Sequence, residues 1–184
     1  ERMIGKHEIT ILTVEKFSND TSRGVHTGIN ENIKIVPVKN LNHIKIIKPF
    51  IRSYIAVYNS NVTVYTMLKK AREILKKNDD YYVIALGTVF AAKTARLIKK
   101  EFPNVKTIVS SRSLHPEVLE ETYPGVGRFA FKMERENLKA ADDIWSNGED
   151  TYNSLKKKGF ESRIIKNGVD LRKANSIEPY NFAD

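Results

Sequence analysis

The sequence predicts an α/β fold, a Rossmann-like, doubly wound parallel sheet with helices on both faces. Short apolar strands alternate with amphipathic helices along most of the chain, and this alternation is typical of parallel sheets. Tyr81–Leu86 is a continuous apolar run, as expected of a strand that is covered on both faces. Val105–Ser110 is predicted to be the next buried strand. A strand–helix–strand unit over residues 143–166 supports the same fold class.

The strand–helix–strand unit carries the clearest local signals. A strand is predicted at Asp143–Ser146 and ends at an Asn-Gly turn. A helix follows from about Glu149 to Lys158, with acidic residues in its first turn and lysines in its last, as the helix dipole favours. Gly159 is placed to cap this helix. Arg163–Lys166 is then a second short strand, which ends at another Asn-Gly pair.

The same periodicities predict the upstream elements. Near the N-terminus, strands are expected at Glu8–Val14 and Ile33–Val38, separated by a polar loop. Apolar residues at helical spacing predict three further helices, at Val62–Lys77, Thr88–Glu101 and Phe129–Ala140.

One further predicted helix, Asn42–Tyr58, combines an apolar stripe with positive charge. Isoleucines and tyrosines recur at helical spacing with Lys45, Lys48 and Arg52 between them, and Pro49 must start, break or kink the helix. Such a helix either packs its stripe on the sheet or lies on an anionic membrane surface. We favour packing, because apolar stripes usually face a core, and keep a peripheral membrane contact as the alternative.

Length and composition restrict the possible classes of protein. With 184 residues the chain is one domain with room for a substantial core. No apolar run approaches the roughly 20 residues that span a bilayer. The absence of Cys excludes disulfides and thiolate metal sites, and it fits a cytoplasmic location. The net charge of +9 suits an anionic partner, although lysine-rich composition explains it equally well.

Two loops that follow predicted strands are candidates for ligand binding, because open parallel sheets bind ligands beyond the carboxyl ends of their strands. Gly87-Thr88 opens a helix whose free backbone N–H groups suit an anion; the alternative is a glycine turn in which Thr88 caps the helix. The loop after the next strand gathers hydroxyls, a guanidinium and an imidazole, on Ser111, Arg112, Ser113 and His115. Arginine suits phosphate and sugar oxygens, and histidine exchanges protons near neutral pH.

Other chemistries find little support in the sequence. The four histidines lack zinc spacing and no Cys accompanies them, so neither a metal nor another cofactor is expected. No Walker A or G-x-G-x-x-G loop is present. The glycine-containing segment Pro124–Arg128 follows no strand and is interpreted as a surface turn. The acidic pairs Asp79-Asp80 and Glu120-Glu121 are interpreted as solvated charges, not as a general acid–base pair.

An ordered set of residues near the C-terminus resembles a known family. Ala141-Asp142 opens a strand, Gly148-Glu149 starts a helix, Gly159 ends it, and a strand leads into Asn167–Asp170. This order resembles the segment that closes the N-terminal domain of GT-B-fold retaining glycosyltransferases of family four. The family usually carries Ser where this chain has Gly148, so no hydroxyl is available at that position.

The resemblance implies a fold and an activity. Residues 1–174 would form the N-terminal, acceptor-side domain of a GT-B enzyme, with its first strand missing from this sequence, and residues 175–184 a linker or tail. The enzyme would move a sugar, with retention, from a nucleotide-sugar donor to a sugar or lipid-linked acceptor. In the family the second domain binds most of the donor, so we expect these residues alone to be inactive.

The resemblance also implies site residues. The family carries a His shortly after the strand predicted at Val105–Ser110. By direct register Arg112 holds its place, and His115 follows three residues later, so both are candidate catalytic residues. Substrate contacts are expected at Gly87, Thr88, Ser111, Ser113, Gly148, Glu149, Asn167 and Gly168.

A function of another class stays open. A non-catalytic Rossmann-like module that binds an anionic ligand or nucleic acid would also suit the positive charge. Nucleic acid is the less expected of these ligands, because aromatic residues suited to base stacking are not interleaved with Lys and Arg. A native reading frame that continues for another domain beyond residue 184 would favour the glycosyltransferase.

Overall fold

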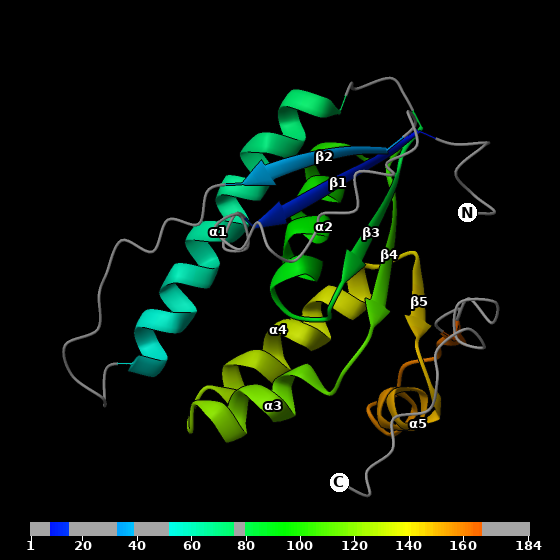
Figure 1. Cartoon of the computed structure of the whole chain (residues 1–184). Coiled ribbons are helices and arrows are strands. Elements are labelled where there is room, and N and C mark those ends of the chain that lie inside the picture. Colours follow the sequence, from blue (N-terminus) through cyan, green and yellow to red (C-terminus); the bar gives the residue numbers. More distant parts are fainter. Residues whose placement is uncertain (1–7, 15–32, 39–51, 76–79, 167–184) are drawn as a thin grey trace, which may run out of the picture.

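The computed structural model describes residues 8–14, 33–38, 52–75 and 80–166, and within these ranges it is an α/β structure with parallel sheets. The first two strands, β1 (Ile9–Val14) and β2 (Ile33–Val38), pair in parallel and form a sheet of their own. Helix α1 (Arg52–Ile74) follows β2, and Figure 1 shows it beside the β1–β2 pair. Both strands lie where the sequence predicted them.

The second sheet has four parallel strands in the order β3-β4-β5-β6. The prediction that the strands near residues 81–86, 105–110 and 143–146 are parallel neighbours is therefore confirmed. Figure 1 shows the arrowheads of β3, β4 and β5 at the same end of the sheet. The strands are β3 (Tyr82–Leu86), β4 (Lys106–Ser111), β5 (Asp143–Ser146) and β6 (Arg163–Ile164).

Four helices join these strands. Three of them were predicted, whereas α3 was not. Pro116 lies in the first turn of α3, where the backbone N–H that proline lacks would have no partner within the helix. Gly159 ends α5 as predicted: its φ of +83° is left-handed, and the N–H of Phe160 reaches the carbonyl of Leu155 at 2.9 Å. The helices are α2 (Phe90–Glu101), α3 (His115–Thr122), α4 (Gly127–Ala140) and α5 (Glu149–Lys157).

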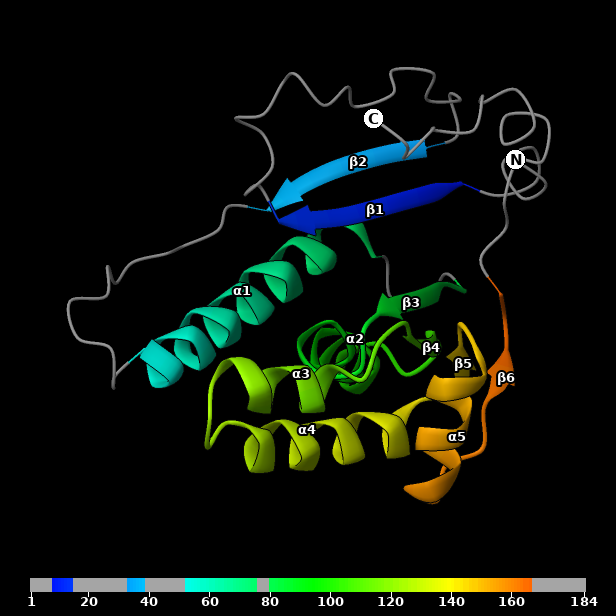
Figure 2. The ribbon, with the colours of Figure 1, turned by 60° about the horizontal axis from the view of Figure 1, so that its bottom comes forward.

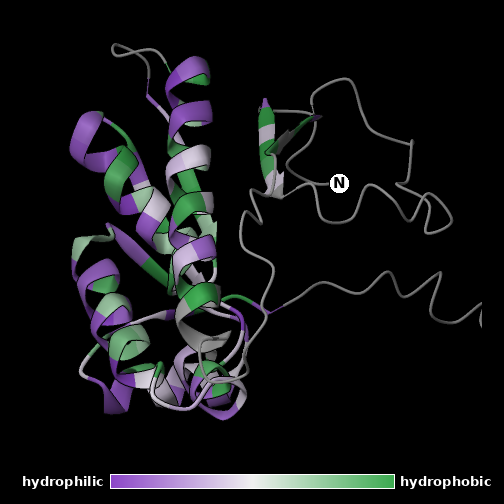
Figure 3. Ribbon diagram, turned by 90° about the vertical axis from the view of Figure 1, so that its left-hand side faces the viewer, coloured by the Kyte–Doolittle hydropathy of each residue, from purple (hydrophilic) through white to green (hydrophobic). Residues whose placement is uncertain are grey.

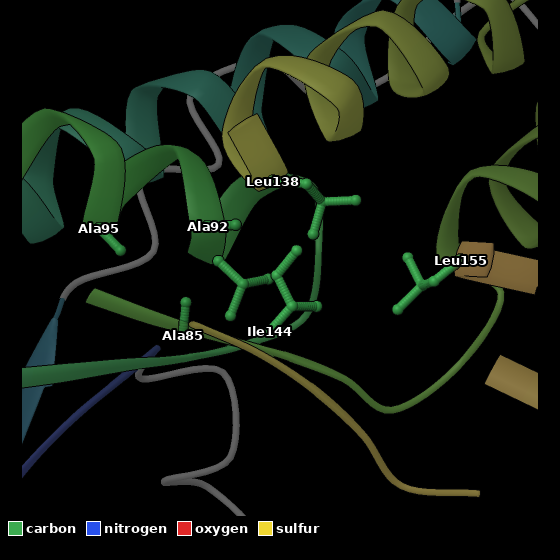
Figure 4. Packing of buried hydrophobic residues seen from close by; sticks show 7 residues of the cluster. Ala85, Ala92, Ala95, Leu138, Ile144 and Leu155 are labelled. Carbon is green, nitrogen blue, oxygen red and sulfur yellow. The ribbon is translucent and has the colours of Figure 1, made fainter. Parts of the chain in front are cut away.

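The main core lies between the four-stranded sheet and the helices α2, α4 and α5. Figure 4 shows Ala92 and Leu138 on the helices above Ala85 and Ile144 on the strands, with Leu155 of α5 at one end. All five side chains are buried. Figure 3 shows that the helices carry both hydrophobic and hydrophilic residues, as expected of helices with one face on a core.

Helix α1 corrects the prediction of two separate helices. The structure has one continuous helix across residues 58–62, where a break was expected, and residues 42–51 lie outside the described part of the chain. Polar side chains within the helix bond back to its own carbonyls: Asn61 donates to Val57 at 2.8 Å and Thr63 to Asn59 at 3.0 Å. The polar residues therefore interrupt the apolar stripe without ending the helix.

In the described residues, one face of β3 is exposed, whereas the prediction was that helices cover both faces of the sheet. Neighbouring residues of a strand point to opposite faces, so Tyr82, Ile84 and Leu86 share the face opposite Ala85. Their exposed fractions are 75%, 40% and 60%. In the described residues, the core cluster of α2, α4 and α5 lies on the other face of β3. Figure 2 shows β1 and β2 beyond β3, as a separate pair.

Within the described residues, no helix combines the length and the apolar character that crossing a membrane would require.

Candidate functional site

The candidate site lies at the carboxyl edge of the four-stranded sheet. Three short loops follow β3, β4 and β5 there, and each leads into a helix: residues 87–89 into α2, residues 112–114 into α3 and residues 147–148 into α5. This is the edge at which open parallel sheets bind ligands. The predicted loops at Gly87-Thr88 and at Arg112-Ser113 therefore belong to one edge of the molecule.

Hydrogen bonds join the three loops. The N–H of Gly87 donates to the carbonyl of Ser110 at 2.9 Å, which ties the first loop to the end of β4. Asn147 ties the second loop to the third, because its backbone N–H donates to the carbonyl of Ser111 at 3.2 Å and its side-chain Nδ2 to that of Arg112 at 3.1 Å. The loop that carries Arg112 is thus held from both sides.

The predicted site residues fall into exposed and buried groups. Arg112 and Ser113 are exposed at the end of β4, where a ligand has access to them. Thr88 and Ser111, at 0% and 3% exposure, lie beneath the surface, so their hydroxyls do not face solvent. His115 is the first residue of α3, but its side chain lies outside the description.

The third loop supplies the remaining described candidates. Gly148 precedes α5 in an extended conformation, and Glu149 is exposed in the first turn of that helix. The carbonyl of Gly148 accepts a hydrogen bond from Thr151 at 3.0 Å, so the helix start is held from within. Asn167 and Gly168 lie outside the described residues.

Three helix N-termini meet this edge without side-chain caps. In α2, α3 and α5 the residue before the helix makes no capping side-chain hydrogen bond. Thr88 is not the cap of α2; Val89 occupies that position. The first N–H groups of a helix have no partner within the helix, and the dipole makes that end favourable for negative charge. Together with Arg112, the edge is chemically suited to an anionic group.

Asn137, which was not among the predicted site residues, holds the first loop. This buried residue of α4 donates from Nδ2 to the carbonyl of Thr88 at 3.0 Å and to that of Val89 at 2.7 Å. The buried face of α4 also contains Ala130, Met133 and Glu134. A polar residue inside an otherwise apolar helical stripe was the signal that would have marked Asn137 and Glu134.

Lys158 joins the helices behind the site. Its ammonium lies 2.7 Å from the carboxylate of Glu134 on α4 and 3.0 Å from that of Glu117 on α3, and 5.1 Å from the ring centre of Phe131. Burial disfavours the charged form of Lys158, but the hydrogen bonds to Glu134 and Glu117 outweigh it and raise the pKa of the lysine. The start of α3 is therefore tied to α4 and to the end of α5.

Glu120 and Glu121 are exposed, as the interpretation of this acidic pair as solvated charges expects, but Glu120 also has a structural role. Its carboxylate accepts hydrogen bonds from the N–H of Gly125, at 3.0 Å, and from that of Gly127. These two bonds lower the pKa of Glu120. A Cβ on Gly127 would lie 2.3 Å from the carboxylate, so glycine permits the contact. The glycine-containing turn is thus ordered by Glu120 between α3 and α4.

Asp142, part of the Ala-Asp pair, is bound near the opposite end of the strands. Its carboxylate accepts from the N–H of Thr107 at 2.8 Å and from its hydroxyl at 3.1 Å, and it pairs with the ammonium of Lys99. Partial burial opposes the charge, but these hydrogen bonds prevail and lower the pKa of Asp142 to about 2. The residue therefore anchors the entry to β5 and lies away from the candidate site.

The chain is thus an α/β protein with parallel sheets, in which the loops after β3, β4 and β5 lie at one carboxyl edge. Comparison with known proteins gives no closer identity: no protein-family model matches the chain, and no curated protein is significantly similar to it. In the part of the chain that the structure describes, no group of three His, Asp or Glu side chains is placed to hold a metal ion.

Proposed function

We propose that this chain is the acceptor-side domain of a GT-B glycosyltransferase that transfers a sugar, with retention, from a nucleotide-sugar donor. The observation that carries the proposal is the joined edge after β3, β4 and β5, where Arg112 and Ser113 are exposed beside three uncapped helix starts. An acceptor that bears a phosphate, or a sugar with several hydroxyls, suits this combination of donors.

The residues that carry the family resemblance have structural roles that support the proposal. Asp142 anchors the entry to β5, Gly148 precedes α5, Glu149 begins it and Gly159 ends it in a left-handed conformation. These residues follow one another along one strand–helix–strand unit in the same order as in the family. Transfer would also need a donor-binding domain, which the proposal places after this one.

The role proposed for this domain is to hold the acceptor. Binding two substrates in reactive orientation lowers a barrier by up to about 7–11 kcal/mol, so an acceptor site alone is expected to give no turnover. Arg112 would contact an acidic or hydroxyl-rich acceptor. His115 is proposed as the group that exchanges a proton near neutral pH.

The test is sugar transfer by the native polypeptide. UDP-, GDP- and ADP-sugars are offered with lipid-phosphate, monosaccharide and polysaccharide acceptors, and product is followed by mass spectrometry. We expect Arg112→Ala and His115→Ala each to reduce kcat/KM at least tenfold. Arg135→Ala, which removes an exposed arginine from α4, is the matched control and should leave kcat/KM unchanged.

Two outcomes would contradict the proposal in different ways. Full transfer by both Arg112→Ala and His115→Ala would refute the site but not the activity. No transfer by the unmodified protein with any donor, together with tight binding of phosphate or oligonucleotide, would replace the enzyme with a non-catalytic anion-binding module.

A further inference from the structure

The turn between β3 and α2 is held from beneath by one buried side chain. Asn137 is 1% exposed and reaches it from α4, while the two residues whose carbonyls it binds, Thr88 and Val89, are both 0% exposed. Gly87 begins the turn with a φ of +122°, a conformation that side-chain-bearing residues rarely adopt. The turn thus has a positive φ at Gly87 and accepts hydrogen bonds from Nδ2 of Asn137.

The chemistry of this contact is specific to a carboxamide. The carbonyl of Val89 also accepts the helix bond from Lys93 at 2.9 Å, so Nδ2 of Asn137 adds a second donor there. In return Asn137 leaves its own Oδ1 buried without a partner, and Thr88 does the same with its hydroxyl. Unpaired buried polar atoms are destabilising. An apolar residue at position 137 would avoid part of that cost but would not bind the turn.

We infer that Asn137 is a positioning residue of the acceptor site, an inference that rests on the proposed function. Its two hydrogen bonds fix where the chain leaves β3 and the direction in which α2 begins. The N–H of Gly87, in the same turn, bonds to the end of β4, directly before the loop that carries Arg112. Displacement of the turn therefore shifts the first loop relative to Arg112, and it leaves unchanged the donor site, which the proposed function assigns to another domain.

The test compares variants of Asn137 in the native, active polypeptide. Asn137→Asp keeps the shape but sets carboxylate oxygens against two carbonyls. Asn137→Leu keeps the branching at Cγ, with somewhat larger end groups, but removes the donor. We expect either variant to raise the KM for the acceptor about tenfold, which corresponds to the loss of one or two hydrogen bonds, while the KM for the donor stays within twofold. Asn137→Ser keeps one donor, so its KM for the acceptor should lie between that of the unmodified protein and those of the other two variants. It is the variant to use if the other two fail to fold.

A control separates positioning from stability. Thr107→Val removes another buried polar group, the partner of Asp142 near the opposite end of the strands. It should lower the denaturation midpoint without changing the KM for the acceptor. An unchanged acceptor KM in Asn137→Leu or Asn137→Ser, or an equal change in Thr107→Val, would overturn the inference and leave the proposed function standing. Absence of sugar transfer by the native polypeptide, tested with the donor-binding domain that the proposal requires, would overturn both.

Discussion

Replacement of Lys158 by Met removes the cation that a buried carboxylate depends on. The Glu134 side chain is only 4% exposed, and the side chains of Lys158 and Glu117 are 24% and 32% exposed. In Lys158→Met, the carboxylate of Glu134 loses the cation beside it, and the loss of one partner from a fully buried pair costs about 3–5 kcal/mol. Because Lys158 is partly exposed, we expect a loss of about 3 kcal/mol in the free energy of unfolding.

Urea denaturation at pH 7 measures this loss, with far-UV circular dichroism and the fluorescence of Trp145, the single tryptophan, as probes. Lys157→Met is the matched control; it removes an exposed lysine from the same turn and should change stability by less than about 0.5 kcal/mol. Adding Glu134→Gln to Lys158→Met should recover most of the loss at pH 7. A loss below about 1 kcal/mol, or one that Glu134→Gln does not reduce, would refute the reasoning.

Two further predictions concern the sheet. Leu138→Ala, at a site 2% exposed, should lower the free energy of unfolding by about 2–5 kcal/mol. Leu86→Ala, at a site 60% exposed, should lower it by less than about 1 kcal/mol. Equal losses in urea titrations would mean that the face of β3 is covered in solution. Asp142→Asn should cost about 1 kcal/mol at pH 7, since solvent screens a pair of which each side chain is 30% exposed. Because the pKa of Asp142 is lowered from 3.8 to about 2, this contribution is present above pH 3.8 and should vanish as pH falls to about 2; a loss that persists there would contradict it.

Much of the fold could be predicted because its signals are local. The strands near residues 82–86, 106–111 and 143–146 were recognised from short apolar runs, and α5 from its charged turns and Gly159. The common edge on which the loops lie could also be predicted, because parallel strands place their carboxyl ends together. The helix at residues 115–122 was missed because it is short and begins within a loop that reads as a binding segment.

The candidate site was predictable in position but not in construction. Arg112 and Ser113 are exposed as a binding loop requires, yet Thr88 and Ser111 turned out to be buried. Whether a hydroxyl after a strand faces solvent or the core depends on the helix packed against it. No spacing in the chain encodes that packing. For the same reason, the polar Asn137 within an apolar stripe could have been noticed in the sequence, but its partners, the carbonyls of Thr88 and Val89, could not have been predicted.

By itself the sequence determined the kind of elements, their order and the parallel direction of the main strands, because hydrophobic period and turn chemistry act between near neighbours. The tertiary structure alone decided that α1 runs without a break, that one face of β3 is exposed, and that Lys158 joins Glu117 to Glu134. These outcomes depend on which surfaces meet and which charges lose water together. Burial and pairing between distant segments are properties of the packed chain, and they become defined only when the helices and the sheet come together.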